Sequence, residues 1–155
     1  MIKVMFVCHG NICRSPMAEF IFKDLVKIEN LSDEFFISSA ATSTEEIGND
    51  IDYRAKRELE KHGIIANGKK AIQITKNDYN LYDYILVMDD WNLRNIKRII
   101  PSDSENKIHK LLDFSNNKRD ISDPWYSGDF DKAYCDILEG CKSFLEYLKS
   151  RALIK

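Results

Sequence analysis

The strongest constraint on the fold is a buried strand that runs through a short loop directly into a helix. Residues 2–7 are apolar and rich in residues that favour strands, which is typical of a parallel strand covered on both faces. Ser15 suits a helix N-cap and Pro16 the first helical position, and apolar residues then recur at helical spacing. We therefore expect a helix from Pro16 towards Asn30.

The same alternation of strands and helices continues along the rest of the chain. We expect further strands at 35–39, 84–88 and 108–111, and an edge element at 71–74. We expect helices at 53–62, after the capping-box sequence 75–78, at 91–99 and at 131–149. The segment 113–128 is expected to be a loop. This pattern predicts an α/β fold: a single doubly wound domain, residues 1–155, with a four-stranded parallel sheet and helices on both faces. Ligands bind such a sheet at the carboxyl ends of its strands.

Length and composition exclude several classes of protein. The 155 residues fit one domain, and 23 basic against 25 acidic residues leave no basic face for a nucleic acid. No segment approaches the roughly 20 apolar residues that span a bilayer, and the apolar start is too short for a signal peptide. Four cysteines are too few for a disulfide scaffold, so we expect reduced thiols in a cytoplasmic protein.

The loop after the first strand carries the residues best suited to chemistry. It consists of Cys8, His9, Gly10, Asn11, Ile12, Cys13, Arg14 and Ser15. A helix N-terminus offers unpaired N–H groups to an oxyanion, and Arg14 adds a planar fork that grips two of its oxygens. The same positive field favours the thiolate of Cys8, which we expect to attack phosphorus. Ser15 can hydrogen-bond to that thiolate, and Gly10 and Asn11 permit the backbone angles that turn amides inward.

Cleavage of a phosphate ester also requires a proton for the departing oxygen. The best candidate is Asp123, which is followed by Pro124, Trp125 and Tyr126. The two aromatic residues suit a flat aryl leaving group. Taken singly, Cys8 is better explained as an inert buried thiol and Arg14 as a surface cation, and Asp123 fits a turn as well as an acid. Their combination favours a catalytic site.

These residues closely resemble the low-molecular-weight protein tyrosine phosphatases, and the resemblance extends over nearly the whole chain. The matching segments are 4–16, 38–43, 62–64, 84–89 and 123–126. The resemblance implies hydrolysis of phosphotyrosine in protein substrates without metal or cofactor, with phosphate or other oxyanions as product or inhibitor. It also implies that Cys8 forms a phosphocysteine, that Arg14 binds phosphoryl oxygens and that Asp123 serves as acid and then as base.

The resemblance assigns further roles around the loop. It implies that Asn11, Ser15 and Ser39 support the loop or the thiolate, and that Trp125 and Tyr126 form the aromatic wall of the substrate cleft. Glu45 stands near a position where the family often has a cleft aromatic, with Ile47 close by, and an acidic residue there is expected to repel acidic peptides.

Two positions beside the expected edge element also depart from the family. Lys69 and Ile72 stand where the family often has a histidine and an arginine. We therefore expect the polar residues that support the loop to form a different set of hydrogen bonds in this chain.

Cys13 is implied to be a redox partner of Cys8, since a neighbouring thiol can trap the oxidised nucleophile as a disulfide. Two rival functions remain open at this point. One is a thiol-dependent arsenate reductase of the same fold, which needs relay cysteines in the segment that corresponds to 82–89, where none occurs. The other is a non-catalytic phosphotyrosine-binding module, which would be expected to lose Cys8, Arg14 or Asp123.

Overall fold

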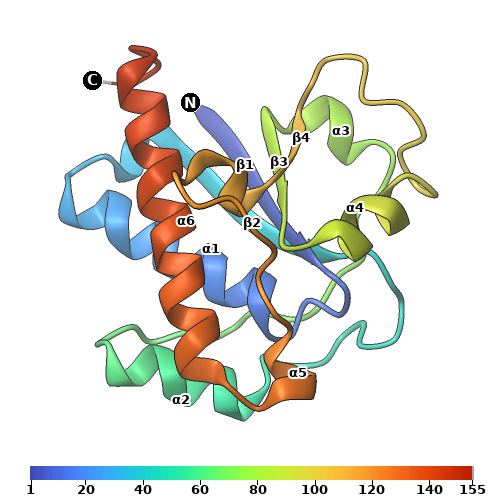
Figure 1. The fold of residues 1–155 in the computed structure, drawn as a ribbon, viewed down its shortest axis with the longest axis vertical. Coiled ribbons are helices and arrows are strands. Elements are labelled where there is room, and N and C mark those ends of the chain that lie inside the picture. The colour runs from blue at the N-terminus through green and yellow to red at the C-terminus, as the bar shows by residue number, and fades with distance from the viewer. Residues whose placement is uncertain (155) are drawn as a thin grey trace.

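The computed structural model describes residues 1–154 and contains one four-stranded parallel sheet (Figure 1). Its strands are β1 (Ile2–Cys8), β2 (Phe35–Ala41), β3 (Tyr84–Val87) and β4 (Ile108–Lys110), in the order β2-β1-β3-β4. Val4 of the central strand β1 pairs with Ile37 on one side and Tyr84 on the other. The predicted sheet is confirmed.

Helices cover both faces of this sheet. They are α1 (Arg14–Ile28), α2 (Tyr53–Lys61), α3 (Asp78–Leu81), α4 (Asp90–Ile96), α5 (Pro124–Ser127) and α6 (Phe130–Ser150), with 3-10 turns η1 (Ser32–Glu34) and η2 (Leu111–Phe114). Figure 1 shows α1 and α6 on one side of the sheet and α3 and α4 on the other. The doubly wound arrangement is therefore also confirmed.

Alternate residues of β1 point into two separate hydrophobic cores, as the pleat of a strand requires. Val4 and Phe6 belong to the core under α1 and α6, where the ring of Phe22 lies 5.8 Å from Phe6 and 5.5 Å from Phe144. Met5 and Val7 belong to the other core, with residues of α3 and α4. The two cores hold β1 firmly, so its carboxyl end is a rigid base for the loop that follows.

The start of α1 differs from the prediction. The helix begins at Arg14 with Cys13 at the N-cap position and without a side-chain cap, so the prediction of Ser15 as the N-cap was wrong. The reason is chemical, because the hydroxyl of Ser15 lies 3.0 Å from the sulfur of Cys8 and the N–H of Ser15 donates to the same sulfur. The amides that a capping side chain would satisfy instead face the loop.

Several other elements also differ from the expected bounds. The expected edge element at 71–74 is reduced to an isolated bridge between Ala41 and Gln73, α4 ends at Ile96 instead of residue 99, and β4 ends at Lys110. The expected loop at 113–128 contains the helix α5, because Asp123 caps it and Pro124 takes its first position. Such short elements depend on tertiary contacts that a local pattern does not reveal.

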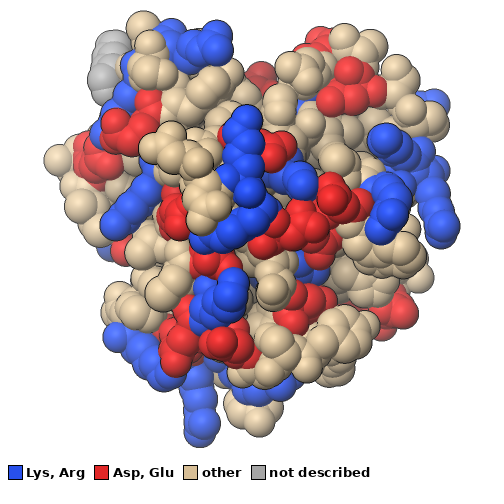
Figure 2. Space-filling model, in the orientation of Figure 1, with Lys and Arg blue, Asp and Glu red and all other residues tan. Residues whose placement is uncertain are grey.

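The surface carries intermixed charges, as Figure 2 shows for one face. Among residues 1–154, no helix combines the length and the apolar character needed to cross a membrane.

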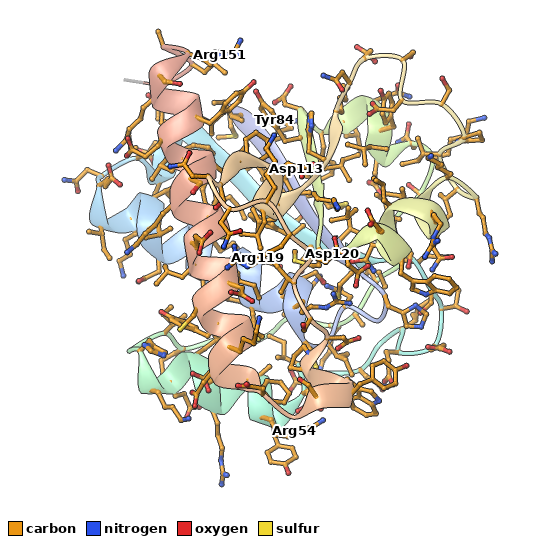
Figure 3. All side chains as sticks on the ribbon, viewed as in Figure 1. Arg54, Tyr84, Asp113, Arg119, Asp120 and Arg151 are labelled. Atoms are coloured by element: carbon orange, nitrogen blue, oxygen red, sulfur yellow. The ribbon has the colours of Figure 1, made fainter. Side chains whose placement is uncertain are left out.

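An ion-pair network fixes the segment that leads to α5. Arg119 donates to Asp136 at 2.7 Å and to Glu139 at 3.0 Å, both on α6, and Ser115 also donates to Glu139. Figure 3 shows Arg119 on this segment beside α6. The network anchors the chain to α6 a few residues before Asp123.

Glu139 makes this anchor sensitive to acid. Hydrogen bonds from Arg119 and Ser115 lower the pKa of Glu139 to about 2 from 4.5. A carboxylate whose pKa is depressed by folding stabilises the native state above its unfolded pKa, and the contribution is lost as the pH falls towards its folded pKa. We expect Glu139→Gln to lower the free energy of unfolding at pH 7 by less than about 1 kcal/mol, because the pair is partly exposed.

Urea unfolding of the wild type and of Glu139→Gln at a series of pH values measures this effect. The difference in free energy between the two proteins should shrink as the pH falls from about 4.5 towards 2. A difference that stays constant over this range would show that the carboxylate contributes no pH-dependent stability.

Candidate active site

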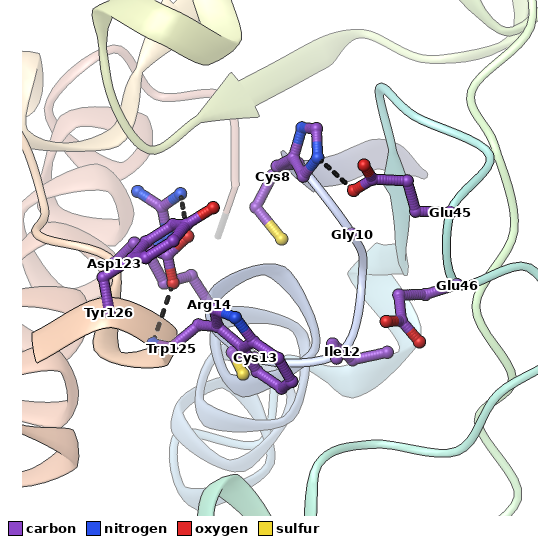
Figure 4. Close-up of a pocket in the computed structure, with 11 residues that line it drawn as sticks. Cys8, Gly10, Ile12, Cys13, Arg14, Glu45, Glu46, Asp123, Trp125 and Tyr126 are labelled. Atoms are coloured by element: carbon purple, nitrogen blue, oxygen red, sulfur yellow. Dashed lines mark hydrogen bonds and ion pairs between the residues drawn. The ribbon is translucent and has the colours of Figure 1, made fainter. Parts of the chain in front are cut away.

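A pocket of about 430 Å³ opens at the carboxyl end of β1, above the N-terminus of α1 (Figure 4). The residues that line it are Cys8, His9, Gly10, Ile12, Cys13, Arg14, Glu45, Glu46, Asp123, Trp125 and Tyr126. They come from three separate parts of the chain. The structure thus brings together the loop and the distant acid that the sequence singled out.

The sulfur of Cys8 lies at the base of this pocket and receives three polar contacts. The backbone N–H groups of Asn11 and Ser15 both donate to it at 3.4 Å, and the hydroxyl of Ser15 lies 3.0 Å away. Donors aimed at sulfur favour its anionic form. The predicted hydrogen bond between Ser15 and Cys8 is present.

Asn11 supports the loop from beneath. Its backbone adopts a left-handed conformation with φ of 59°, as the sequence predicted for this residue. Its side-chain amide donates to the hydroxyls of Ser15 at 2.8 Å and Ser39 at 2.9 Å, and its oxygen accepts the backbone N–H of Ile72 at 3.2 Å. Gly10 has no left-handed backbone; a side chain there would lie 3.4 Å from Glu46.

A buried carboxylate extends this support. Glu19 accepts the hydroxyl hydrogen of Ser39 at 2.6 Å and is paired with Lys23. Lys69 donates to the backbone oxygen of Ser39 at 2.7 Å. The loop therefore rests on β2 through a continuous chain of hydrogen bonds. Lys69 and Ile72, the two positions that depart from the family, both belong to this chain of hydrogen bonds, Ile72 through its backbone only.

The guanidinium of Arg14 is buried and held by groups from two other loops. One of its nitrogens donates to Asp89 at 2.6 Å and to the backbone oxygen of Ile121 at 2.7 Å, and the other lies 3.4 Å from Asp123. Burial alone would lower the pKa of Arg14, but the charges of Cys8, Asp89 and Asp123 outweigh it and raise that pKa. Arg14 therefore remains a cation at the pocket floor.

Asp123 stands on the opposite rim as the N-cap of α5. One of its oxygens accepts the N–H of Trp125 at 3.0 Å, and the other faces Arg14. Trp125 and Tyr126 follow on the pocket wall and are exposed, Tyr126 to 83 %. Arg54 stacks over the ring of Trp125 at 5.4 Å and braces that wall.

The third wall comes from the segment after β2. His9 donates through Nε2 to Glu45 at 2.5 Å, so the negative charge of Glu45 has a close partner. Glu46 lines the pocket beside it. Ile47, which was expected in the cleft, is exposed and is not among the lining residues. The turn after Glu46 carries it away from the pocket.

Sequence reasoning missed the functional contacts of Asp89 and Glu19. Asp89 caps α4 through one oxygen, which accepts the N–H of Asn92, and its other oxygen accepts a hydrogen bond from Arg14. Its position directly after β3 was a usable signal, because the carboxyl ends of β1 and β3 meet at one edge. Glu19 gave no signal, since it stands among ordinary helical residues.

Comparison with known proteins agrees with this geometry. A sequence model described as low molecular weight phosphotyrosine protein phosphatase matches residues 3–153. The chain belongs to this family. A low molecular weight phosphotyrosine protein phosphatase of Gallus gallus is 47 % identical over 148 residues, which cover 92 % of this chain and 93 % of that protein. The PtpA phosphatase of Staphylococcus aureus is 36 % identical over 100 % of this chain and 99 % of its own length.

Solved structures of the phosphatase family share the fold over nearly the full chain. YfkJ from Bacillus subtilis superposes with a TM-score of 0.93 at 35 % identity, covering 97 % of this chain and 96 % of that one. A structure titled as a Drosophila arginine phosphatase has a TM-score of 0.87 at 36 % identity, with 96 % and 98 % covered. Phosphatases of this fold therefore include one whose title names a different substrate.

Proposed function

We propose that this chain hydrolyses phosphotyrosine in protein substrates through a phosphocysteine intermediate. The single observation that carries the proposal is the convergence of Cys8, Arg14 and Asp123 on one pocket. A nucleophile, an anion-binding group and an acid are the three functions that cleavage of a phosphomonoester requires.

In the first step the thiolate of Cys8 attacks phosphorus, and the bond to the phenolic oxygen breaks. The loop amides and Arg14 stabilise the charge on the phosphoryl oxygens. Asp123 gives its proton to the departing phenolate. Ile12, Trp125 and Tyr126 offer an apolar and aromatic surface to the tyrosine ring, which favours an aryl ester over a short alkyl ester.

In the second step water attacks the phosphocysteine. Asp123, now a carboxylate, accepts a proton from this water, and the sulfur of Cys8 leaves as a thiolate. Ser15 and the two loop amides stabilise the returning charge, so the enzyme is restored with phosphate as product. Phosphate and similar oxyanions are expected to inhibit by occupying the same cradle.

The rival functions have less support. Arsenate reduction needs relay cysteines near the site, but Cys135 and Cys141 lie on α6 and neither lines the pocket. A non-catalytic phosphotyrosine-binding module does not require a proton donor opposite the thiolate. We further infer that residues 1–155 form a single domain in the cytoplasm, where a nucleophilic thiol stays reduced.

The test is a comparison of phosphate release from phosphotyrosine, phosphoserine and phosphoarginine peptides, with acid-quench mass spectrometry of the enzyme during turnover. We expect release from phosphotyrosine and a phosphoryl group on Cys8. Preference for phosphoarginine, or a phosphoryl group on another residue, would contradict the proposal.

Reversible oxidation is expected as well, because Cys8 and Cys13 line the same pocket. Burial, followed by the negative charges of Cys8, Asp52 and Asp123, raises the pKa of Cys13, so that it stays a protonated thiol during catalysis. Peroxide converts Cys8 to a sulfenic acid. Attack by Cys13 then forms a disulfide and releases water. We expect a dithiol to restore most activity to the wild type and little to Cys13→Ser.

Activity recovery and peptide mass spectrometry after mild peroxide measure this protection. The exposed Cys135 offers a matched control, since Cys135→Ser should recover like the wild type. Detection of only the sulfinic and sulfonic forms of Cys8 in the wild type would rule out the disulfide.

A further inference from the structure

A second pocket adjoins the active site. It encloses about 400 Å³, and the residues that line it are His9, Thr42, Ser43, Thr44, Glu45, Gln73, Trp91, Asn95, Arg98 and Ile99. His9 and Glu45 also line the active site, so this hydrogen-bonded pair forms the ridge between the two pockets. A chain that enters one pocket can therefore cross directly into the other.

Two buried polar atoms in this second pocket lack partners. Thr42 is only 7 % exposed, yet its hydroxyl has no hydrogen-bond partner within residues 1–154, and neither does Nδ1 of His9. Buried polar groups are normally satisfied, because an unsatisfied one costs about 1–3 kcal/mol. The neighbouring backbone oxygen of Thr42 is already satisfied by Gln73, at 3.1 Å. Both atoms are covered by the protein, so the groups available to a ligand are the exposed side chains that line the pocket.

The charge around this pocket favours an anion. Arg98 lines it and is exposed, and Arg94 is exposed four residues earlier. Figure 2 shows basic side chains gathered over α4, at the right of the view. The ring of Trp91 is 56 % exposed and carries Arg94 at 5.1 Å. The one lining carboxylate, Glu45, is paired with His9, which lessens the repulsion that the sequence led us to expect.

We propose that this pocket binds an acidic side chain next to the phosphotyrosine of a peptide substrate, with Arg98 as its partner. The inference rests on the proposed function, since the phosphotyrosine anchors the peptide. An extended chain advances about 3.3 Å per residue, so a side chain within about two positions of the phosphotyrosine reaches across the ridge. A carboxylate suits a guanidinium, which can donate two parallel hydrogen bonds to it.

The experiment measures kcat/KM for phosphotyrosine peptides that carry Glu, Gln or Lys at the flanking positions, with phenyl phosphate as a substrate that has no flanking residues. For the wild type we expect about a fivefold preference for Glu over Gln, the size of one partly exposed ion pair. Arg98→Ala should reduce the preference to about one, and Arg98→Glu should transfer it to the Lys peptide. Hydrolysis of phenyl phosphate should not change.

A matched control comes from the same turn. Lys97 is an exposed cation that does not line the pocket, so Lys97→Ala should keep most of the preference for Glu. Equal effects of Lys97→Ala and Arg98→Ala, or an unchanged preference in Arg98→Ala, would overturn the inference. If the wild type did not hydrolyse phenyl phosphate at all, the proposed function would be refuted instead.

Discussion

Replacement of Cys8 by serine is expected to lower kcat for aryl phosphates by about four to six orders of magnitude, as removal of an enzymatic nucleophile does elsewhere. The three donors that favour a thiolate cannot do the same for a hydroxyl, whose proton is held far more tightly. Binding of phosphate should survive, because the cradle consists of backbone amides and Arg14. Steady-state kinetics and calorimetric titration with phosphate separate the two effects.

Cys135→Ser is the matched control for this substitution. Cys135 is an exposed cysteine on α6 outside the pocket, so kcat should equal that of the wild type. Full activity in Cys8→Ser would end the thiolate mechanism. Loss of phosphate binding in Cys8→Ser would show instead that the loop had rearranged.

Replacement of Asp123 by alanine is expected to lower kcat by about 10²–10⁴-fold, the usual contribution of a general acid. The loss should be largest for phenyl phosphate and smallest for nitrophenyl phosphate, whose leaving group departs without a proton. Asp123 also caps α5, and loss of a cap costs about 1 kcal/mol. Asp123→Asn separates the two roles, because asparagine caps a helix but carries no acidic proton.

We expect Asp123→Asn to lose activity as Asp123→Ala does while it keeps the thermal stability of the wild type. Asp129 offers a control of the same chemical kind, since it caps α6 through the N–H of Lys132 and lies outside the pocket. Asp129→Asn should leave kcat unchanged. Equal losses with both leaving groups in Asp123→Asn would mean that Asp123 does not donate the proton.

Local sequence was sufficient to predict the parts of the site that lie within one loop. Cys8, Asn11 and Ser15 stand in one loop, and their residue types alone indicated the thiolate and its donors. The same hydroxyl of Ser15 also shows the limit of such patterns. A serine before a proline suits a helix cap, yet here both the hydroxyl and the N–H of Ser15 are directed at the sulfur of Cys8.

Contacts between distant residues were less accessible. Arg14 donates to Asp89 and to Ile121, which are 75 and 107 positions away, and no spacing rule connects them. The order of the strands supplies the missing information, because β1 and β3 are neighbours and Asp89 follows β3 closely. The second pocket could not be predicted for the same reason, since Thr42 and Arg98 line one pocket only after the sheet has formed.

The shortness of α5 has a consequence for how activity is lost. Its four residues are joined to the loop that carries Cys8 by the contact between Asp123 and Arg14, whereas the cradle itself rests on β1 and β2. Segments with so few contacts open at a lower free energy than the whole fold. A molecule in which only α5 has opened would still capture phosphotyrosine but could not expel the phenol. On warming, the enzyme should thus pass through a state that sequesters its substrate before it unfolds.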